Sequence, residues 1–272
     1  MAKKKLGIYG TQESTANHKV EDLYIIVDHQ SIHFAVKHLV SNHYIAFESF
    51  VSGNEVNGFT QLLAYLQNNS KLMHSVYNNV HFVMNNSRVL ISKQQNVKDN
   101  TIYQNELNIV FGQQPDQELL VTNIDQQKVL VSTIPDIYQT LLTRSFPTGK
   151  WSHYANAMLN YAHQNGFHIY FFESFYILLI RNQEGVQFLK YFEESEEAQN
   201  VYNVLSACKH LQINPNNESL FLRGYHAENN HWVIELGTYF NEAIVEQSSE
   251  EGVGKALHQE YPHHQFATYF IF

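Results

Sequence analysis

Two long stretches of this chain follow the same pattern of strand, turn and strand. The first is Leu23–Val51 and the second is Phe167–Phe192. In each stretch one carboxylate, Asp28 or Glu173, interrupts an apolar run, and a second apolar strand follows a short polar or aromatic turn. Apolar runs of this length between turns are typical of buried strands. The repeat therefore predicts a duplicated α/β architecture with a cleft between the two copies.

The remaining sequence divides around this repeat. Residues 21–150 are expected to form the first half of the protein and residues 151–272 the second. Residues 93–134 begin with a stretch rich in Gln, Asn and Asp, and we interpret them as an insertion in the first half. Residues 1–20 are polar and rich in Gly, Thr, Ser and Asn, so they are predicted to be a flexible tail.

Periodicity and turn residues predict the individual elements. Apolar residues at helical spacing indicate helices over Phe59–Met73 and Lys150–Gln164. Val80–Met84 and Arg88–Ser92 are expected to be two short strands around a hairpin corner. Gln265–Ile271 is predicted to be a closing strand.

Composition excludes several classes of function. The formal net charge of −9 argues against nucleic-acid binding, which needs a basic surface to replace phosphate counterions. The single cysteine, Cys208, excludes an intramolecular disulfide and is expected to be a buried apolar side chain. No stretch approaches the roughly 20 apolar residues of a membrane span, and nothing resembles a signal peptide. We therefore expect a cytoplasmic protein without a membrane span.

A pattern of hydrophobic residues and turns in the second half carries a resemblance to a known family. It lies in the segments Gly166–Glu173, Gly185–Glu193, Val201–Leu205 and Leu211–Gly224. The pattern resembles an uncharacterised bacterial family, a domain of unknown function with an actin-like ATPase fold. That fold consists of two ribonuclease-H-like halves with a cleft between them. Leu23–Val36 and Lys128–Pro147 extend the resemblance into the first half, so that it spans most of residues 20–272.

The resemblance implies where a nucleotide would bind. In the wider superfamily each half offers a first-hairpin loop with an Asp, a Gly and a hydroxyl residue, and a later glycine turn holds adenosine. Asp28 and Ser31 stand in the first loop, Glu173 in the second and Gly224 in the adenosine turn. These four residues are the candidate nucleotide-binding residues, with ATP and magnesium as the implied ligands.

The loops depart from the superfamily pattern. Neither contains a glycine, so side chains stand where backbone N–H groups would approach phosphate. We therefore expect no cofactor and no catalysis, and interpret the chain as an actin-like interaction scaffold or regulator with an unknown protein partner. The alternative is an ATP-binding or weakly ATP-hydrolysing protein in which Asp28 and Glu173 face a shared magnesium–phosphate site.

The same residues allow other chemistries to be considered for the chain, each with weaker support in the sequence. Asp28, Glu48 and Asp136 are a hypothetical two-metal carboxylate cluster of the ribonuclease H type. Ser31 or Ser174 as a nucleophile lacks a Gly-x-Ser-x-Gly elbow. The adjacent His263 and His264 are expected on a strand edge, where neighbouring side chains point to opposite faces and cannot easily share a metal.

Overall fold

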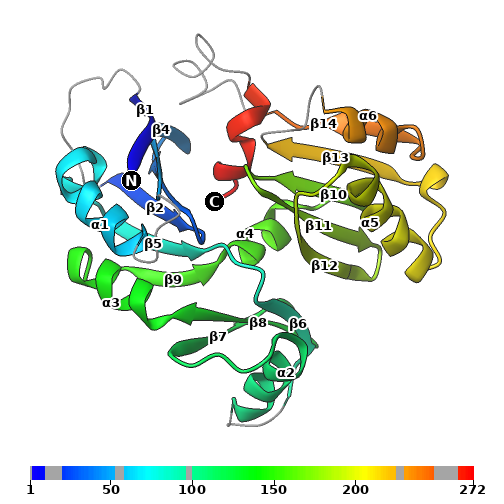
Figure 1. The fold of residues 1–272 in the computed structure, drawn as a ribbon, viewed down its shortest axis with the longest axis horizontal. Coiled ribbons are helices and arrows are strands. Elements are labelled where there is room, and N and C mark those ends of the chain that lie inside the picture. The colour runs from blue at the N-terminus through cyan, green and yellow to red at the C-terminus, as the bar shows by residue number, and fades with distance from the viewer. Residues whose placement is uncertain (1, 10–19, 53–57, 96–99, 225–229, 248–262) are drawn as a thin grey trace. The chain divides into compact units, whose positions relative to one another are not determined.

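The structure is a computed structural model that describes residues 2–9, 20–52, 58–95, 100–224, 230–247 and 263–272. These residues divide into two compact units. Unit 1 extends to Met158 and includes the last residue, Phe272, whereas unit 2 begins at Leu159. Figure 1 shows the elements of both units.

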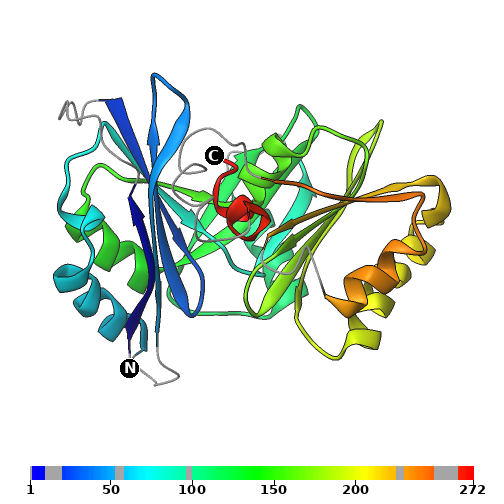
Figure 2. The same cartoon turned by 90° about the horizontal axis from the view of Figure 1, so that it is seen from above.

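Unit 1 is built on a six-stranded sheet with the order β1-β4-β3-β2-β5-β9. Its strands are β1 (Lys3–Tyr9), β2 (Glu21–Val27), β3 (Ser31–His38), β4 (His43–Val51), β5 (Asn79–Met84) and β9 (Lys150–His153). The helices α1 (Gly58–Asn69) and α3 (Asp136–Ser145) cover one face of this sheet (Figure 2, cyan and green helices). Leu66 of α1 and Leu142 of α3 share a core with Ile25 and Phe34 of the sheet.

Unit 1 also contains a second, smaller sheet, which together with the helix packed on it includes most of the described residues between 93 and 134. It has the order β6-β8-β7 and is made of β6 (Val89–Lys93), β7 (Gln117–Asn123) and β8 (Lys128–Pro135). The helix α2 (Thr101–Phe111) packs on it through Tyr103 and Leu107, which meet Val129 and Val131.

Unit 2 contains a five-stranded sheet with the order β12-β11-β10-β13-β14. Its elements are β10 (Gly166–Phe171), β11 (Phe175–Asn182), β12 (Gly185–Glu193), α5 (Glu197–His210), η3 (Pro215–Asn217), β13 (Ser219–Gly224), α6 (His231–Gly237), β14 (Glu242–Val245) and η4 (His263–Tyr269). Val204 of α5 and Trp232 of α6 share a core with Ile169 and Leu178 of the sheet. As predicted, Cys208 is buried and free.

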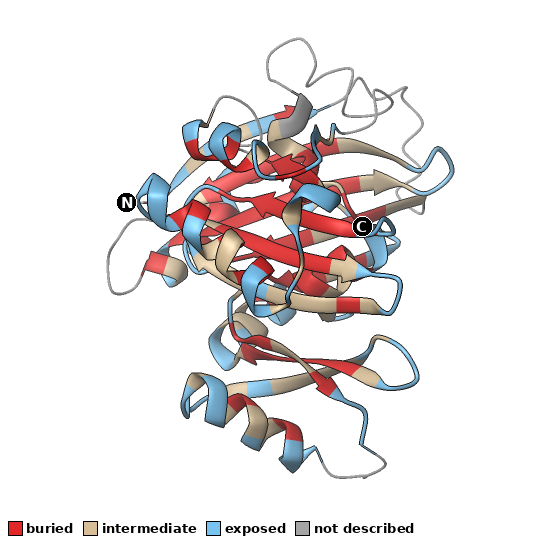
Figure 3. Cartoon of the chain, turned by 90° about the vertical axis from the view of Figure 1, so that its right-hand side faces the viewer, coloured by how far each residue is buried: buried red, intermediate tan, exposed pale blue. Residues whose placement is uncertain are grey.

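The two main sheets repeat one topology. In each, three consecutive strands, β2–β4 or β10–β12, form an antiparallel meander. A fourth strand pairs in parallel with the first strand of the meander, and a fifth pairs in parallel with the fourth. The order β4-β3-β2-β5-β9 thus matches β12-β11-β10-β13-β14, the predicted ribonuclease-H-like arrangement. Buried residues concentrate along these strands (Figure 3). The stretches Leu23–Val51 and Phe167–Phe192, from which the repeat was predicted, form β2–β4 and β10–β12.

Three predicted elements differ in the structure. Residues 3–9 of the expected tail form β1, which pairs antiparallel with β4, whereas residues 10–19 lie outside the described residues. Val80–Met84 and Arg88–Ser92 do not form a hairpin, because β5 and β6 belong to different sheets. Gln265–Ile271 is not a closing strand, because η4 is a 3-10 helix over most of this range.

The helix predicted over Lys150–Gln164 begins later than expected. Lys150–His153 form β9, which pairs with β5, and the helix α4 covers Tyr154–Tyr161. The buried His153 ring marks the change, because its Nδ1 accepts the Ala155 N–H at 3.1 Å and its Nε2 lies 3.1 Å from the Asn86 carbonyl oxygen. Burial lowers the pKa of His153 to about 3, so the ring is neutral and can accept this hydrogen bond. Because β9 belongs to the first sheet, the boundary between units falls after residue 150, at Met158.

A buried carboxylate on β4 bonds to β1 and to the segment before η2 (Leu72–His74). Glu48 of β4 has 0% exposure and accepts hydrogen bonds from Lys4 Nζ at 2.5 Å and from the Tyr9 hydroxyl. It also accepts from Ser70 Oγ at 2.5 Å and from the Lys71 backbone N–H at 3.1 Å. Burial raises the pKa of Glu48. These donors lower it by more than burial raises it, so the pKa lies below its ordinary value.

We predict that Glu48→Gln destabilises the protein by about 2–4 kcal/mol, because it weakens a buried ion pair and several charge-assisted hydrogen bonds. Urea unfolding at pH 7 measures the loss, and the exposed Glu118→Gln in unit 1 is the matched control. Because the folded-state pKa of Glu48 is lowered, its contribution is present above the ordinary pKa and lost as pH falls below about 4. A difference between Glu48→Gln and the parent that stays constant down to pH 2 would contradict this account.

Candidate functional site at the first hairpin

The candidate residue Asp28 lies in the turn between β2 and β3 and closes that turn with its own carboxylate. Its Oδ1 accepts the backbone N–H of Gln30 at 2.8 Å and that of Ser31 at 2.6 Å. The Asp28 N–H in turn donates to the Ser31 carbonyl at 3.1 Å. Two N–H groups that could otherwise face an anion are therefore bonded within the loop.

Ser31 connects this carboxylate to a histidine. Ser31 Oγ lies 2.5 Å from Asp28 Oδ2 and 2.6 Å from His33 Nε2, and all three side chains are buried. Burial raises the pKa of Asp28. The His33 imidazole and the donors Ser31 and Gln30 lower it by more than burial raises it, so the pKa lies below its ordinary value. Asp28 is thus ionised at neutral pH and can only accept hydrogen bonds.

The direction of these hydrogen bonds decides what the cluster can do. A hydroxyl has one proton, and Ser31 donates it to the ionised Asp28. His33 Nε2 then carries a proton and donates to Ser31 Oγ, so the imidazole is not placed as a base toward that hydroxyl. The arrangement stabilises a buried turn and does not activate Ser31 as a nucleophile.

The same turn occurs elsewhere in the chain. Asp125, in the exposed turn between β7 and β8, accepts the backbone N–H of Gln127 at 2.7 Å and that of Lys128 at 2.8 Å. The spacing from carboxylate to amides is the same as at Asp28. Because this fold feature recurs on an exposed hairpin of a different sheet, it is a general way in which this chain closes a turn.

The second hairpin aligns differently from the sequence-based prediction. Val27 pairs with Ile32 in unit 1, and Phe171 pairs with Tyr176 in unit 2. The Phe172 N–H donates to the Phe175 carbonyl at 2.9 Å, as the Asp28 N–H does to Ser31. Phe172 is therefore the topological counterpart of Asp28.

Glu173 consequently occupies the position that His29 occupies in the first turn, one residue beyond the carboxylate position. Its side chain is exposed, whereas Phe172 is buried and stacks on Phe175 with ring centroids 4.6 Å apart. The alignment of Asp28 with Glu173 is wrong by one residue. An aromatic pair, rather than a carboxylate, closes the second turn.

Gly224 ends β13 with a φ of +104°, a conformation that favours glycine. A Cβ atom at this position would lie 2.3 Å from the Phe171 carbonyl oxygen and 2.6 Å from Thr268 Cγ2 of η4. The absent side chain thus leaves room for η4 and β10 of the same unit. This packing explains the glycine without a ligand.

Beside this glycine, unit 2 holds an ion pair between the buried Arg223 and the half-buried Glu246. Arg223 Nε donates to Glu246 Oε2 at 3.1 Å, and Arg223 Nη2 donates to the Tyr161 hydroxyl at 2.8 Å. Arg223 Nη1 lies 3.4 Å from the Ala267 carbonyl oxygen. The guanidinium therefore ties β13 to η4 and to the end of α4, which is a packing role.

The hypothetical cluster of Asp28, Glu48 and Asp136 is not formed. Glu48 accepts a hydrogen bond from Ser70 on the helix-covered face of the sheet. Asp28 contacts Ser31, which contacts His33 on the other face. Asp136 is exposed at the start of α3. Within the described residues no group of three His, Cys, Asp or Glu side chains could hold a metal ion.

The remaining candidates are the nucleophile Ser174 and the histidine pair His263 and His264. Ser174 is exposed in the second turn. His263 and His264 belong to η4 and not to a strand, and their side chains lie outside what the structure describes. Sequence reasoning missed His33, although its spacing of two residues from Ser31 places both on one face of β3 and could have indicated the contact.

We predict that Asp28→Asn lowers the free energy of unfolding by about 1–2 kcal/mol, because the amide no longer accepts the Ser31 proton with a full negative charge. Asp125→Asn removes the same charge from an exposed turn and is expected to change stability by less than about 0.5 kcal/mol. Urea unfolding compares the two variants at pH 7. Equal effects would show that burial of the Asp28 cluster is irrelevant to its strength.

We predict that Gly224→Ala destabilises the protein by about 2–4 kcal/mol, through backbone strain and collision with Phe171 and Thr268. Gly185→Ala is the matched control, because Gly185 has a φ of +98° but nothing within 4 Å of its would-be Cβ. Thermal unfolding of both variants separates collision from strain. An equal loss in the two variants would exclude the collision.

Comparisons with solved structures agree on the fold. A protein from Bacteroides thetaiotaomicron, described as having an actin-like ATPase fold and unknown function, has a TM-score of 0.73 at 13% identity, over 84% of this chain and 91% of that one. The PilM-PilN type IV pilus biogenesis complex has a TM-score of 0.57 at 10% identity, over 93% of this chain and 97% of that one. The chain has the predicted actin-like ATPase fold.

No curated protein matches the sequence. No helix among the described residues is long and apolar enough to cross a membrane. A family model described as "Protein of unknown function (DUF3822)" matches residues 11–242, which is most of the chain. The predicted resemblance to a family of unknown function is confirmed, and the chain belongs to the DUF3822 family.

Proposed function

We propose that this protein is a non-catalytic actin-like protein that acts as a scaffold or regulator for a protein partner in the bacterial cytoplasm. The observation that carries the proposal is the closed first loop. The N–H groups of Gln30 and Ser31 donate to Asp28 Oδ1, so the donors that would hold phosphate are used by the protein itself.

The second unit supports the same proposal. Its turn has Phe172 where the first has Asp28, so the position offers no carboxylate to a hydrated magnesium ion. The space beside Gly224 is filled by Phe171 and Thr268 of the same unit. Asp28, Ser31 and Gly224 thus have internal structural roles, and an aromatic pair closes the second turn in place of a carboxylate.

Binding to a protein partner is a function that this fold can have without a nucleotide. PilM, whose structure was solved in a complex with PilN, shares the fold with this chain at a TM-score of 0.57. That likeness supports binding to another protein, and the acidic net charge of −9 favours a partner with a basic surface.

We predict that isothermal titration with ATP and magnesium at pH 7.5 gives no saturable heat, so that any dissociation constant exceeds about 1 mM. The physical reason is that nucleotide would have to break the buried hydrogen bonds of the Asp28 turn. Asp28→Ala is titrated in parallel and is expected to behave like the parent. Saturable binding that disappears in Asp28→Ala would overturn the proposal and favour the ATP-binding alternative.

The scaffold role has a separate measurement. The full chain, immobilised through a tag and exposed to lysate of its source cells, is expected to retain one protein in a defined stoichiometry, measured by quantitative mass spectrometry. Glu118 is exposed on β7, and Glu118→Gln tests whether removal of one surface charge alone reduces retention of the partner. A strict monomer that retains nothing above a tag-only control would contradict the scaffold role.

A further inference from the structure

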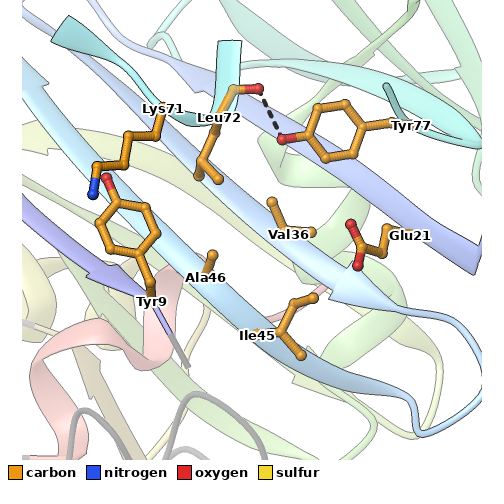
Figure 4. A pocket seen from close by; sticks show the side chains of 8 residues that line it. All are labelled: Tyr9, Glu21, Val36, Ile45, Ala46, Lys71, Leu72 and Tyr77. Atoms are coloured by element: carbon orange, nitrogen blue, oxygen red, sulfur yellow. Dashed lines mark hydrogen bonds between the residues drawn. The ribbon is translucent and has the colours of Figure 1, made fainter. Parts of the chain in front are cut away.

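A pocket of about 340 Å³ lies in unit 1 and is not part of the predicted nucleotide site. It lies over the sheet beside η2 (Leu72–His74), at the end of β2 that begins with Glu21 (Figure 4). Asp28 follows the opposite end of the same strand. The volume falls in the range of small-molecule sites, which begins at about 300 Å³.

The floor of this pocket is apolar and is shaped by a β-bulge. Val36 of β3 pairs with Ala46 of β4, and Ala46 pairs with Tyr9 of β1, so these residues form a row across the sheet. Between Val36 and Lys37 the register shifts, so Ile45 has no partner on β3 and lines the pocket next to Ala46. Bulges of this kind re-aim side chains and are common beside functional sites.

The rim carries opposite charges at separate places. Lys71 and the Tyr9 hydroxyl lie together at one side of the pocket, and Lys71 Nζ is 4.7 Å from the centroid of the Tyr9 ring (Figure 4). Glu21 and Tyr77 lie at the other side. The Tyr77 hydroxyl donates to the Leu72 carbonyl at 2.8 Å, which fixes this ring as a wall. The pocket therefore has a cationic side, an apolar floor and an anionic side.

Glu48 holds the cationic side in place from below. Its carboxylate accepts from the Tyr9 hydroxyl and from the Lys71 backbone N–H, two of the pocket's own residues. It also accepts from Ser70, which immediately precedes Lys71. A carboxylate with 0% exposure thus positions both residues of one rim.

We propose that this pocket binds a small linear zwitterion, with a carboxylate at one end, an ammonium group at the other and a hydrocarbon body between them. The ligand carboxylate accepts a hydrogen bond from Lys71, the ammonium donates to Glu21, and the hydrocarbon covers Val36 and Ile45. The Tyr9 hydroxyl donates its one proton to Glu48, so Tyr9 forms a wall beside Lys71 and is not a donor to the ligand. Glu48 is a positioning residue for this site.

The charge arrangement selects this class over simpler ligands. A ligand with a single carboxylate would meet Lys71 but place hydrocarbon beside the charge of Glu21, and one with a single ammonium would meet Glu21 but place hydrocarbon beside the charge of Lys71. An uncharged hydrocarbon would desolvate both rims without a polar contact in return. Only a ligand with both charges and an apolar body meets every side of the pocket.

The test uses the full chain and linear amino acids as probes. Isothermal titration at pH 7 with 4-aminobutanoate, 6-aminohexanoate and 8-aminooctanoate is compared with hexanoate and hexylamine. At least one amino acid is expected to bind about tenfold more tightly than both single-charge compounds, because each loses a charge-assisted hydrogen bond. In the parent protein, NMR shifts of the Ile45 and Ala46 amides are expected to change with the same ligand and to locate it without mutation.

Charge-removing variants assign the two ends. Lys71→Met and Glu21→Gln are each expected to weaken binding of the amino acid about tenfold. Lys71→Met should leave hexylamine binding unreduced, and Glu21→Gln should leave hexanoate binding unreduced. The exposed Lys93→Met and Glu118→Gln are matched controls in the same unit and should leave all affinities unchanged.

Several outcomes would overturn the site. One is the absence of both saturable heat and amide shifts at Ile45 and Ala46 with every amino acid. Another is binding of hexanoate or hexylamine as tight as that of the best amino acid. A third is binding that survives Lys71→Met and Glu21→Gln unchanged. Nucleotide titration is not involved, so the result is independent of the proposed scaffold role.

Discussion

Backbone N–H groups at the ends of buried central strands need acceptors inside the protein, and this need shapes both first hairpins. An unsatisfied buried donor costs about 1–3 kcal/mol. In unit 1 the Asp28 carboxylate accepts two such N–H groups, and Ser31 and His33 keep it charged at low exposure. In unit 2 the Phe172 N–H donates to the Phe175 carbonyl, and the two rings stack where the first turn has a carboxylate. One topology thus tolerates two chemically unrelated solutions at the same turn, and neither depends on a bound anion.

The order of strands was predictable because apolar runs and turns are local properties of the sequence. The meander of Phe167–Phe192 and the helix after it follow directly from that pattern. The pattern also placed Asp28 and Ser31 in one turn, where they are in contact. It could not fix the register of the second turn, because an aromatic residue such as Phe172 fits a strand or a turn equally well. Glu173 was therefore matched to Asp28, one residue away from its true counterpart.

Short strands were missed for a different reason. β9 has four residues and owes its conformation to parallel pairing with β5, which is remote in sequence. β1 begins with three lysines and a bulge, so its composition is that of a solvated terminus, and its pairing with β4 decides the structure. The role of Glu48 was equally hidden, because Lys4 and Ser70 come from distant segments of the chain.

The two buried carboxylates of unit 1 differ in a way that bears on function. Asp28 accepts hydrogen bonds from Gln30 and Ser31, and His33 lies only two residues beyond Ser31, so the local turn is sufficient to explain this carboxylate. Glu48 instead accepts hydrogen bonds from β1 and from the segment before η2. Burying its charge costs desolvation free energy, and this carboxylate closes no turn. Such a carboxylate holds β1 against β4 through Lys4, and it also positions the rim formed by Tyr9 and Lys71. The donors to Glu48 therefore come from two segments that are remote from β4 in sequence, whereas the backbone donors to Asp28 come from its own turn.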